Sequence, residues 1–428
     1  MYKPTTCLVN VPHPYLKNPK AQAPIGLLYI AASIREKGFP VEFVDLSDKN
    51  FQDDFEIPEA EIYGITGTVL DRTSCEAVAK YIRKHQPRSR IILGGPITIS
   101  PEVLDRSLFD SLFVGEGEEY FMRVISDFPN LAHKYIAPRI LNLDSLPWPA
   151  RDLLDGQLGG DVFANRKTYF EGGSTVVVMS RGCPFKCSFC ASPSLWKRKV
   201  TYRNADSVAD ELQHVIDTYG VRQFRFSDDN LTNSKERLTQ FCDRLKGMEI
   251  AWRASIRVKP NTIRMFRMMK DAGCTEVCFG IESGDPAVLH CLDKSATVAD
   301  NKEAILNAKM AGLDVRVLFM TGVPGETQQT TDLNIQFLES LKDHFDTVAL
   351  TNYVPLPGTP IANYPEKFGC EILDRDVDKF NLCMYGSDGS ENEWPNLVRP
   401  VGLTIEQLTA SKRAMRDYVI SIGKSNKG

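Results

Sequence analysis

Three cysteines are the residues of this chain best placed to carry out chemistry. Cys183, Cys187 and Cys190 are separated by three residues and then by two, within the run Ser180-Arg-Gly-Cys-Pro-Phe-Lys-Cys-Ser-Phe-Cys190. Thiolates this close together can each bind one iron of a [4Fe–4S] cube. No fourth cysteine lies nearby, so the last iron would keep an open coordination position at which a small molecule can chelate. Since closed electron-transfer clusters use four cysteines, this spacing predicts a cluster at which a reaction takes place.

Zinc binding and disulfide formation are two other common uses of grouped cysteines. A structural zinc site needs four ligands, usually two Cys-x-x-Cys pairs or cysteines with histidines, and neither set accompanies this run. Disulfides need an oxidising compartment, but residues 1–10 contain neither the apolar stretch nor the cleavage signal of a secretory leader. With eleven cysteines and no such signal, the chain is predicted to work in the reducing cytoplasm.

The amino-acid composition limits the classes of protein to which the chain can belong and the kinds of partner it can bind. The 428 residues allow two or three domains, and 43% apolar with 25% charged residues is typical of an ordinary globular chain. No apolar run reaches transmembrane length. A net charge of −4 and a pI near 6.0 provide no electrostatic footprint for nucleic acid. We therefore expect a small-molecule substrate, and neither a membrane nor a nucleic acid as partner.

Residues 1–125 alternate strand patterns with helix patterns, which predicts a parallel sheet covered by helices. The expected strands are Cys7–Asn10, Val41–Asp45, Ile62–Thr66, Arg90–Gly95 and Ser111–Gly115. The expected helices are Ile25–Lys37 and Ser74–His85. Ligands of such sheets bind at the carboxyl ends of the strands. The predicted binding residues at two of these ends are Thr66, Gly67, Thr68, Gly94, Gly95 and Pro96. Glycine at such a position also fits an ordinary tight turn.

A second α/β module is predicted after a Pro- and Asp-rich connector over residues 126–172. Its expected strands are Ser174–Ser180, Val221–Phe226, Ile250–Ser255, Glu276–Ile281, Leu313–Met320 and Asp346–Leu350. With the helices between them these strands make six βα units, and polar or glycine-rich residues follow each strand. In barrels built from such units the carboxyl ends of the strands form the active face. Residues 366–428 are expected to form a short C-terminal extension.

The cysteine run and its surroundings resemble the radical SAM superfamily, which is named after S-adenosylmethionine (SAM). The hallmark of that family is Cys-x-x-x-Cys-x-x-Cys with an aromatic residue before the last cysteine, here Phe189. Further strand-end motifs match at Ser227–Asp229, Gly280–Gly284, Gly322–Glu326 and Pro355–Pro360. The resemblance implies that residues 173–365 form a partial (β/α)6 barrel.

The same resemblance implies the chemistry and one partner. SAM chelates the open iron, and one electron from the cluster cleaves a C–S bond to yield a 5′-deoxyadenosyl radical that abstracts a substrate hydrogen. The electron comes from a donor such as flavodoxin or ferredoxin. Gly322 and Gly325 allow the backbone to approach the adenosyl part of SAM. The protein's own tasks are binding, orientation and exclusion of side reactions.

Four side chains of the barrel are implied SAM contacts. Phe189 offers an apolar surface near the adenine, and Glu282 accepts hydrogen bonds from the two ribose hydroxyls. Asp228, with Asp229 as its neighbour, accepts from the cationic amino group of SAM. Two acids after a strand also commonly cap the next helix, and Glu282 also fits an ordinary surface acid.

Two further features have alternative interpretations. Arg253 and Arg257 alternate on one strand, so they share a face and either bind a carboxylate or phosphate or form structural ion pairs. Residues 370–400 show little periodicity and include the acidic stretch Ser387–Glu393. Such a segment either covers the mouth of the barrel, where substrate enters, or is a solvated surface loop.

The first half of the chain resembles the Rossmann-like cobalamin-binding domain that is fused to many radical SAM enzymes. The matching segments are Pro24–Tyr29, Gly94–Gly95, Gly115–Glu118 and Leu146–Leu154. We expect cobalamin to bind between the two domains, because both present ligand sites at strand carboxyl ends and the reaction needs both cofactors at one substrate. The cobalamin tail is expected near Thr66–Thr68 and Gly94–Pro96.

One departure from that family concerns the cobalt. Other cobalamin domains bind cobalt through Asp-x-His-x-x-Gly after the first strand, whereas this loop reads Val11-Pro-His-Pro-Tyr15. His13 lies in this loop without the neighbours of the motif, and a lone loop histidine is more often solvated. The lower face of the cobalt is therefore expected to lack an imidazole from this domain.

Three functions remain open at this point. The first is a cobalamin-dependent radical SAM C-methyltransferase that uses methylcobalamin and two equivalents of SAM on a small metabolite or natural-product intermediate. The second is a cobalamin-independent radical SAM dehydratase, epimerase or rearrangement enzyme that keeps the first domain as scaffold. The third is a non-catalytic iron–sulfur protein, which would need no SAM pocket. A methylthiotransferase is disfavoured. Such an enzyme would need further cluster-binding cysteines in the first domain, and the only cysteines there are Cys7 and Cys75.

Overall fold

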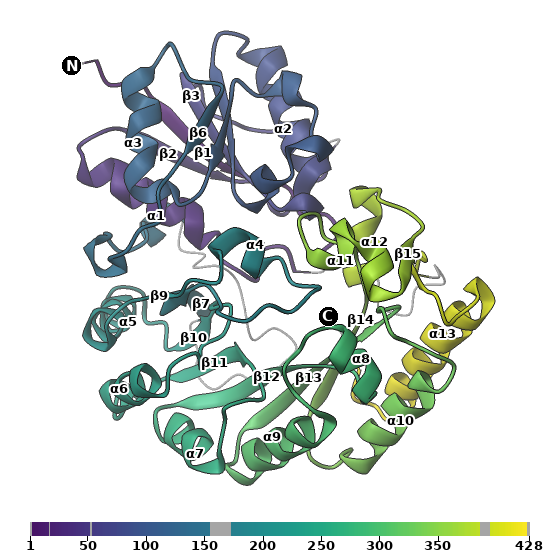
Figure 1. Ribbon diagram of the computed structural model, residues 1–428. Helices are drawn as coiled ribbons and strands as arrows, with labels where there is room; N and C mark the ends of the chain where they lie inside the picture. The colour runs from purple at the N-terminus through teal and green to yellow at the C-terminus, as the bar shows by residue number, and fades with distance from the viewer. Residues whose placement is uncertain (1, 17, 52–53, 155–172, 386–393, 426–428) are drawn as a thin grey trace. The chain divides into compact units, whose positions relative to one another are not determined.

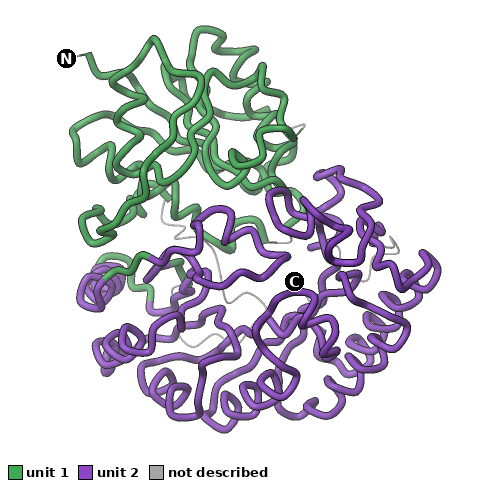
Figure 2. Tube along the Cα trace, viewed as in Figure 1, with its two compact units in different colours: residues 1–176, 201–203, 217–221 green, residues 177–200, 204–216, 222–428 purple. Residues whose placement is uncertain are grey.

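The computed structural model describes residues 2–16, 18–51, 54–154, 173–385 and 394–425 (Figure 1). Its contacts divide the chain into two compact units, coloured separately in Figure 2. The N-terminal unit comprises residues 1–176, 201–203 and 217–221, and the barrel unit comprises residues 177–200, 204–216 and 222–428. Among the described residues, no helix is long and apolar enough to cross a membrane.

The N-terminal unit is built on a six-stranded sheet with the order β2-β1-β3-β4-β5-β6, in which every strand pairs in parallel with its neighbours. The strands are β1 (Thr6–Asn10), β2 (Val41–Asp45), β3 (Ile62–Thr66), β4 (Arg90–Gly94), β5 (Ser111–Val114) and β6 (Lys134–Ile136). The sixth strand corrects the sequence analysis, which ended the set at residue 115 and placed this segment in the connector. Its three residues are too few for a periodic pattern to reveal a strand.

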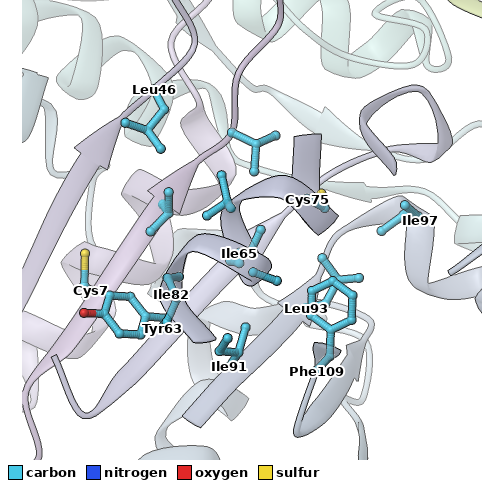
Figure 3. Packing of buried hydrophobic residues seen from close by; sticks show 14 of the residues in the cluster. Cys7, Leu46, Tyr63, Ile65, Cys75, Ile82, Ile91, Leu93, Ile97 and Phe109 are labelled. Atoms are coloured by element: carbon cyan, nitrogen blue, oxygen red, sulfur yellow. The ribbon is translucent and has the colours of Figure 1, made fainter. Parts of the chain in front are cut away.

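Helices cover both faces of this sheet, as a parallel sheet requires. The helices are α1 (Ile25–Glu36), α2 (Arg72–His85) and α3 (Gly117–Asp127). Alternate strand residues, such as Tyr63 and Leu93, pack with Ile82 of α2 in the core shown in Figure 3. The intervening residues, such as Leu8 and Ile92, pack with α1 and α3 on the opposite face.

A second parallel sheet has the order β14-β13-β12-β11-β10-β7. Its strands are β7 (Ser174–Val177), β10 (Gln223–Phe226), β11 (Ala251–Ile256), β12 (Cys274–Glu282), β13 (Asp314–Thr321) and β14 (Thr347–Asn352). Figure 1 shows this sheet curving, with helices along its outer side. These helices are α5 (Ala205–Tyr219), α6 (Lys235–Leu245), α7 (Ile263–Asp271), α9 (Val298–Met310) and α10 (Thr330–Ser340). Within the described residues β7 and β14 are the two edge strands of this sheet and do not pair with each other, so the sheet forms a partial barrel.

Alternating burial along these strands separates core residues from site residues. Trp252, Phe279 and Phe319 are fully buried and contact aromatic rings of α6, α7 and α10 respectively. Residues in alternation with them, including Arg253, are only half-buried and face the inner side of the sheet. This pattern anchors the strands from outside and leaves their inner side and carboxyl ends available for ligands.

Further elements belong to the barrel unit. They are β8 (Ser180–Arg181), α4 (Ser192–Trp196), α8 (Pro286–Cys291), α11 (Pro360–Asn363), β15 (Cys370–Ile372), α12 (Phe380–Tyr385), β16 (Val398–Pro400) and α13 (Ile405–Ser421), with β9 (Thr201–Tyr202) in the N-terminal unit. Strands β15 and β16 form an antiparallel pair. Asn352, the last residue of β14, donates hydrogen bonds to Cys383 Sγ at 3.4 Å and to the Pro395 carbonyl at 2.9 Å. The described part of residues 370–400 therefore reaches the carboxyl end of the barrel sheet, whereas the whole acidic stretch Ser387–Glu393 lies outside the described residues.

Candidate functional site

The three cysteines lie in the loop between β8 and α4. Cys187 is buried, and Cys183 and Cys190 are half-buried. Burial raises the pKa of the Cys190 thiol to about 11, and repulsion from the other two thiolates adds to this rise. Among the described residues, no three Cys, His, Asp or Glu side chains converge as ligands of a single metal ion would. This donor set suits a [4Fe–4S] cube, which takes one thiolate for each of three irons, better than a mononuclear zinc site.

Gly182 fixes the start of the cysteine loop. Its φ is +101°, and a Cβ added there would lie 2.0 Å from the Lys199 carbonyl oxygen. A larger residue would therefore push the two ends of the loop apart. The Gly182 N–H donates to Asp229 Oδ2 at 2.9 Å, which ties the loop to the end of β10.

Asp228 is buried against the strand that leads into this loop. Its carboxylate accepts hydrogen bonds from the Met179 N–H at 3.2 Å and from Ser180 Oγ at 2.6 Å, and also from the Ser180 N–H. Burial raises the pKa of the Asp228 carboxyl to about 6. Asp228 and Asp229 do not cap the next helix, since Ser234 is the N-cap of α6. Together they hold the cysteine loop on the sheet.

Glu282 ends β12 in a geometry that sequence patterns do not reveal. The register of β12 against β13 shifts between Gly280 and Glu282, and Glu282 has a φ of +66°. Such a bulge re-aims a side chain. The buried carboxylate of Glu282 accepts a hydrogen bond from Lys294 Nζ at 2.5 Å. A Cβ on Gly280 would lie 2.4 Å from the Glu282 carboxylate and 2.8 Å from Lys294 Nζ, so glycine is needed to accommodate this ion pair.

A second cation, Arg257, lies beside the cysteines. Its Nη1 donates to Cys187 Sγ at 3.1 Å, and its guanidinium lies 3.8 Å from the centre of the Phe185 ring. Its Nη2 donates to the carbonyl of Lys294, whose Nζ lies 5.6 Å from the centre of the Phe189 ring. The buried Nε of Arg257 has no hydrogen-bond partner in the described part of the chain. A buried cation with spare donor capacity beside a thiol fits an anionic cluster.

The turn after β13 contains Gly322 and Gly325, which both have a positive φ (+73° and +89°). The Gly322 N–H donates to the two carboxylate oxygens of the buried Glu326 at 3.1 and 3.0 Å. Behind this turn lies Lys412 of α13, whose Cε would be 3.1 Å from a Cβ on Gly322. Lys412 Nζ donates to Asn396 Oδ1 at 2.7 Å. The C-terminal helix thus supports the predicted adenosyl turn.

We expect the two buried ionisable groups at this turn to affect stability in opposite pH ranges. Burial raises the pKa of Glu326 from 4.5 to about 7, so its contribution to stability is present below pH 4.5 and is lost as the pH rises to about 7. Burial lowers the pKa of Lys412 from 10.5 to about 8, so its contribution is present above pH 10.5 and is lost as the pH falls to about 8. Each slope is at most about 1.4 kcal/mol per pH unit.

Denaturant unfolding at several pH values, compared between the wild type and Glu326→Gln, measures the first of these slopes. The variant should lose the fall in unfolding free energy between pH 4.5 and 7, whereas Glu406→Gln at the exposed start of α13 should keep it. Equal slopes in the wild type and in Glu326→Gln would show that Glu326 does not titrate in this way.

The structure brings the sequence-predicted residues of the barrel together at the carboxyl ends of β7, β10, β12 and β13. The segment after α8 connects them. The Ser188 N–H donates to the Leu292 carbonyl at 3.0 Å, Lys294 pairs with Glu282, and a Cβ on Gly325 would lie 3.1 Å from Cys291 Cβ. Sequence reasoning missed Lys294 and Lys412, because no motif or periodic pattern links either residue to its partner.

In the N-terminal unit, the predicted residues after β3 and β4 lie against one another. Thr66 and Gly94 are register partners at the ends of these strands. Gly95 has a φ of +83°, and a Cβ there would lie 2.4 Å from Thr66 Oγ1 and 2.7 Å from the Gly67 carbonyl. A Cβ on Gly67 would lie 2.6 Å from Cys75 Sγ. These glycines keep side chains out of the space between the two loops, and Pro96 then begins a short 3₁₀ turn.

The loop after β1 contains a histidine–carboxylate contact that sequence reasoning missed. His13 Nδ1 lies 3.0 Å from Asp71 Oδ1, to which the Tyr15 hydroxyl also donates. Thr68 donates to Asp71 Oδ2 through its N–H at 2.7 Å and its Oγ1 at 2.9 Å. Burial alone would raise the pKa of the Asp71 carboxyl, but hydrogen bonds from His13, Tyr15 and Thr68 hold it below the ordinary value. The expectation of a solvated His13 is therefore wrong, since its side chain is only 19% exposed.

Two family models match the chain. The radical SAM superfamily model matches residues 177–358, and the B12-binding domain model matches residues 20–125. A protein of Pyrococcus horikoshii, described as an uncharacterized methyltransferase, is 31% identical over 369 residues, which cover 80% of this chain and 78% of that protein. This chain belongs to the radical SAM superfamily. The prediction of a radical SAM enzyme with SAM and a [4Fe–4S] cluster as cofactors, fused to a B12-binding domain, is confirmed.

Two further similarities concern a cyclase and a solved methyltransferase structure. An anaerobic magnesium-protoporphyrin IX monomethyl ester cyclase of Cereibacter sphaeroides is 23% identical, with 79% of this chain and 59% of the cyclase covered. The radical SAM methyltransferase TsrM from Kitasatospora setae, solved with cobalamin and a [4Fe–4S] cluster bound, superposes with a TM-score of 0.69. That match covers 97% of this chain and 91% of TsrM at 15% identity. It confirms the predicted fold class, an α/β B12-binding-type domain followed by a radical SAM barrel.

Proposed function

We propose that this radical SAM enzyme is a cobalamin-dependent C-methyltransferase that acts on a small molecule. The observation that carries the proposal is a B12-binding domain in the same chain as a barrel unit that gathers three free cysteines, two buried cations and a buried carboxylate. When bound, the cluster and SAM supply one-electron chemistry, and cobalamin supplies the methyl group. The relatives described as methyltransferases support this assignment.

The first task of the protein is to hold the cluster. Cys183, Cys187 and Cys190 bind it through their thiolates. Arg257 places a positive charge and hydrogen-bond donors beside Cys187, which favours the binding of an anionic group. Asp229, through its bond to the Gly182 N–H, keeps the loop in one conformation, so little order has to be gained when the cluster binds.

The second task is to hold SAM. Glu282 accepts hydrogen bonds from the ribose hydroxyls, and Lys294 Nζ forms an ion pair with this buried carboxylate. Phe189 lies against the adenine, and the backbone at Gly322 and Gly325 approaches the adenosyl group. These assignments rest on the match to family motifs and on the proximity of the residues.

Asp228 is proposed to accept a hydrogen bond from the amino group of SAM, and its existing hydrogen bonds determine which carboxylate oxygen can do so. Its Oδ1 accepts two hydrogen bonds from Ser180, whereas its Oδ2 accepts one from the Met179 N–H and no other from the part of the chain that the structure describes. A carboxylate oxygen has two acceptor positions, so Oδ2 retains one for the ammonium group of SAM. Asp228 therefore holds the cysteine loop and contacts SAM at the same time.

The partners follow from the proposed chemistry. The cluster must receive electrons from a small redox protein such as flavodoxin or ferredoxin, and both the oxygen-sensitive cluster and the free thiols favour a cytoplasmic setting. The acidic balance of the chain, with a net charge of −4, favours a small metabolite or natural-product intermediate as substrate rather than a nucleic acid.

Cobalamin retention is the test of this proposal. The protein is expressed with cobalamin supplied and purified without oxygen, and bound cobalt is quantified together with the visible spectrum. We expect close to stoichiometric cobalamin, held at the strand-end loops that include Thr66–Thr68 and Gly94–Pro96. A protein that retains no cobalamin but still cleaves SAM would contradict the proposal and favour the cobalamin-independent dehydratase, epimerase or rearrangement enzyme.

A matched variant separates cobalamin binding from folding. Gly94→Ala should leave the sheet intact, because a Cβ there meets its nearest atoms at 3.8–3.9 Å, yet it puts a methyl group at the end of β4 where the cobalamin tail is proposed. We expect weaker cobalamin retention with unchanged iron content. Gly26→Ala in α1, where a Cβ meets nothing within 4 Å, is the control and should retain cobalamin like the wild type.

A further inference from the structure

Three consecutive cations follow helix α4 and form a turn at the surface. Lys197, Arg198 and Lys199, the basic turn, are all exposed. The turn lies within residues 173–205, a stretch that contains six basic residues and no acidic one, whereas the whole chain has 55 acidic and 51 basic residues. A stretch with charges of one sign, in a chain whose balance is the opposite, creates a local field that attracts an anionic partner.

The basic turn is attached to the loop that carries the cluster cysteines. Arg198 Nε donates to the Pro184 carbonyl at 3.0 Å, and the Lys199 carbonyl oxygen lies so close to Gly182 that a Cβ there would be 2.0 Å from it. Pro184 and Gly182 are the two neighbours of Cys183 in the chain, and Cys183 is itself only half-buried. The positive charges therefore lie beside a cysteine that is partly accessible from the surface.

The backbone of the basic turn is held in one conformation. Lys197 and Arg198 have positive φ values of +51° and +59°, which residues with a side chain seldom adopt. The Lys197 N–H donates to the Pro193 carbonyl and the Lys199 N–H donates to the Trp196 carbonyl, both at 3.0 Å. Because the backbone is fixed before a partner arrives, less conformational freedom is lost on binding.

The charges of the basic turn are not neutralised by its surroundings. None of its three side chains forms an ion pair with another residue that the structure describes. In contrast, the nearby Lys186 pairs with Asp293 at 2.8 Å. Asp229, the exposed acid beside the cysteine loop, accepts the hydrogen bond of the Gly182 N–H. The basic turn therefore presents three positive charges to the solvent.

We propose that the basic turn is the docking surface for an acidic redox protein that reduces the cluster. The donor gives up one electron and the cluster gains it, so the donor must come close to the cysteine loop. Encounters between redox proteins bury little surface, and complementary charges raise their rate of association. A flavodoxin or ferredoxin with an acidic surface fits these three cations. The inference rests on the SAM cleavage of the proposed function and adds the place at which the electron enters.

Reduction by a protein donor, compared with reduction by a small molecule, tests the proposal on the cluster-loaded, full-length enzyme. The initial rate of 5′-deoxyadenosine formation from SAM is measured against the concentration of reduced flavodoxin, and separately with excess dithionite. We expect Lys197→Glu combined with Lys199→Glu to lower kcat/KM for flavodoxin about 10-fold or more at low salt, and to leave the dithionite rate unchanged. Both substitutions keep the Arg198 bond to Pro184. The wild-type rate with flavodoxin should fall as the ionic strength rises through about 0.1 M, where the screening length is about 10 Å.

Binding gives a second readout that does not depend on catalysis. Oxidised flavodoxin is titrated into the full-length protein without SAM, and the Kd is measured by calorimetry. The Kd should rise about 10-fold or more in the double variant at low salt. Lys235→Glu combined with Arg267→Glu is the matched control, because it changes the net charge by the same amount at exposed positions of α6 and α7. This control should match the wild type in both measurements.

The possible outcomes separate this inference from the proposed function. Equal flavodoxin kinetics and affinity in the wild type and the double variant would overturn the inference, as would a wild type that dithionite reduces but neither flavodoxin nor ferredoxin does. An equal loss of rate with dithionite would assign the two lysines to the cluster site itself and overturn the docking role. A wild type that cleaves no SAM even with dithionite would overturn the proposed function and this inference together. Absence of bound cobalamin would overturn the proposed methyl transfer alone, because SAM cleavage needs an electron in either case.

Discussion

Replacement of Cys187 by alanine is expected to remove the iron–sulfur cluster and abolish SAM cleavage. Cys187 is the most buried of the three cysteines, at 6% exposure, and it accepts the hydrogen bond of Arg257. Its loss leaves two thiolates for a cube that needs three and leaves a buried guanidinium without its sulfur acceptor. We expect iron to fall from about four atoms per chain to near zero, with no 5′-deoxyadenosine formed from SAM.

The measurement is iron content after anaerobic reconstitution, together with the yield of 5′-deoxyadenosine under reducing conditions. Cys291→Ala is the matched control, because Cys291 lies in the segment that contacts the cysteine loop but carries none of the predicted cluster bonds. It should retain iron and activity. Iron binding and SAM cleavage that persist in Cys187→Ala would mean that the cluster is bound elsewhere.

The second large expected effect is the loss of SAM affinity on substitution of Glu282. Because Glu282 forms a buried ion pair with Lys294, the result of a single substitution is difficult to interpret. Glu282→Gln removes one charge and leaves the ammonium of Lys294 buried without its counter-ion. Breaking a buried pair in this way typically costs about 3–5 kcal/mol of stability. The single variant should therefore unfold at lower denaturant concentration, and weaker SAM binding by it would not by itself identify a SAM ligand.

A double variant resolves the ambiguity. Glu282→Gln with Lys294→Met removes both charges, so the free energy of unfolding should return close to that of the wild type. SAM binding should remain weaker by about 10–100-fold, since charge-assisted hydrogen bonds contribute about 1.5–3 kcal/mol. Equilibrium binding of SAM and denaturant unfolding are measured on cluster-loaded protein, with iron content as the check on the site. Wild-type SAM affinity in the stable double variant would exclude Glu282 and Lys294 from the SAM site.

Sequence alone determined the parts of this protein that depend on short-range order. The spacing of Cys183, Cys187 and Cys190 lies within one loop, so it is readable without a fold. Several strands, such as β1, β3 and β7, are buried along nearly their whole length, and apolar runs of this kind are typical of parallel strands whose two faces are covered. Other barrel strands, such as β11 and β13, alternate buried with half-buried residues. The strand-end glycines were also visible, although the close contact of Gly95 with Thr66 was not.

Only the tertiary structure decided which side chains act as pairs. Lys294 meets Glu282 because a bulge turns the end of β12 toward the segment after α8, and Lys412 reaches the turn at Gly322 from a helix about ninety residues later. His13 and Asp71 are fifty-eight residues apart and meet because β1 and β3 are neighbours in the sheet. Such contacts arise where the carboxyl ends of adjacent parallel strands converge. Strand order sets this convergence, and no local pattern of residue types records it.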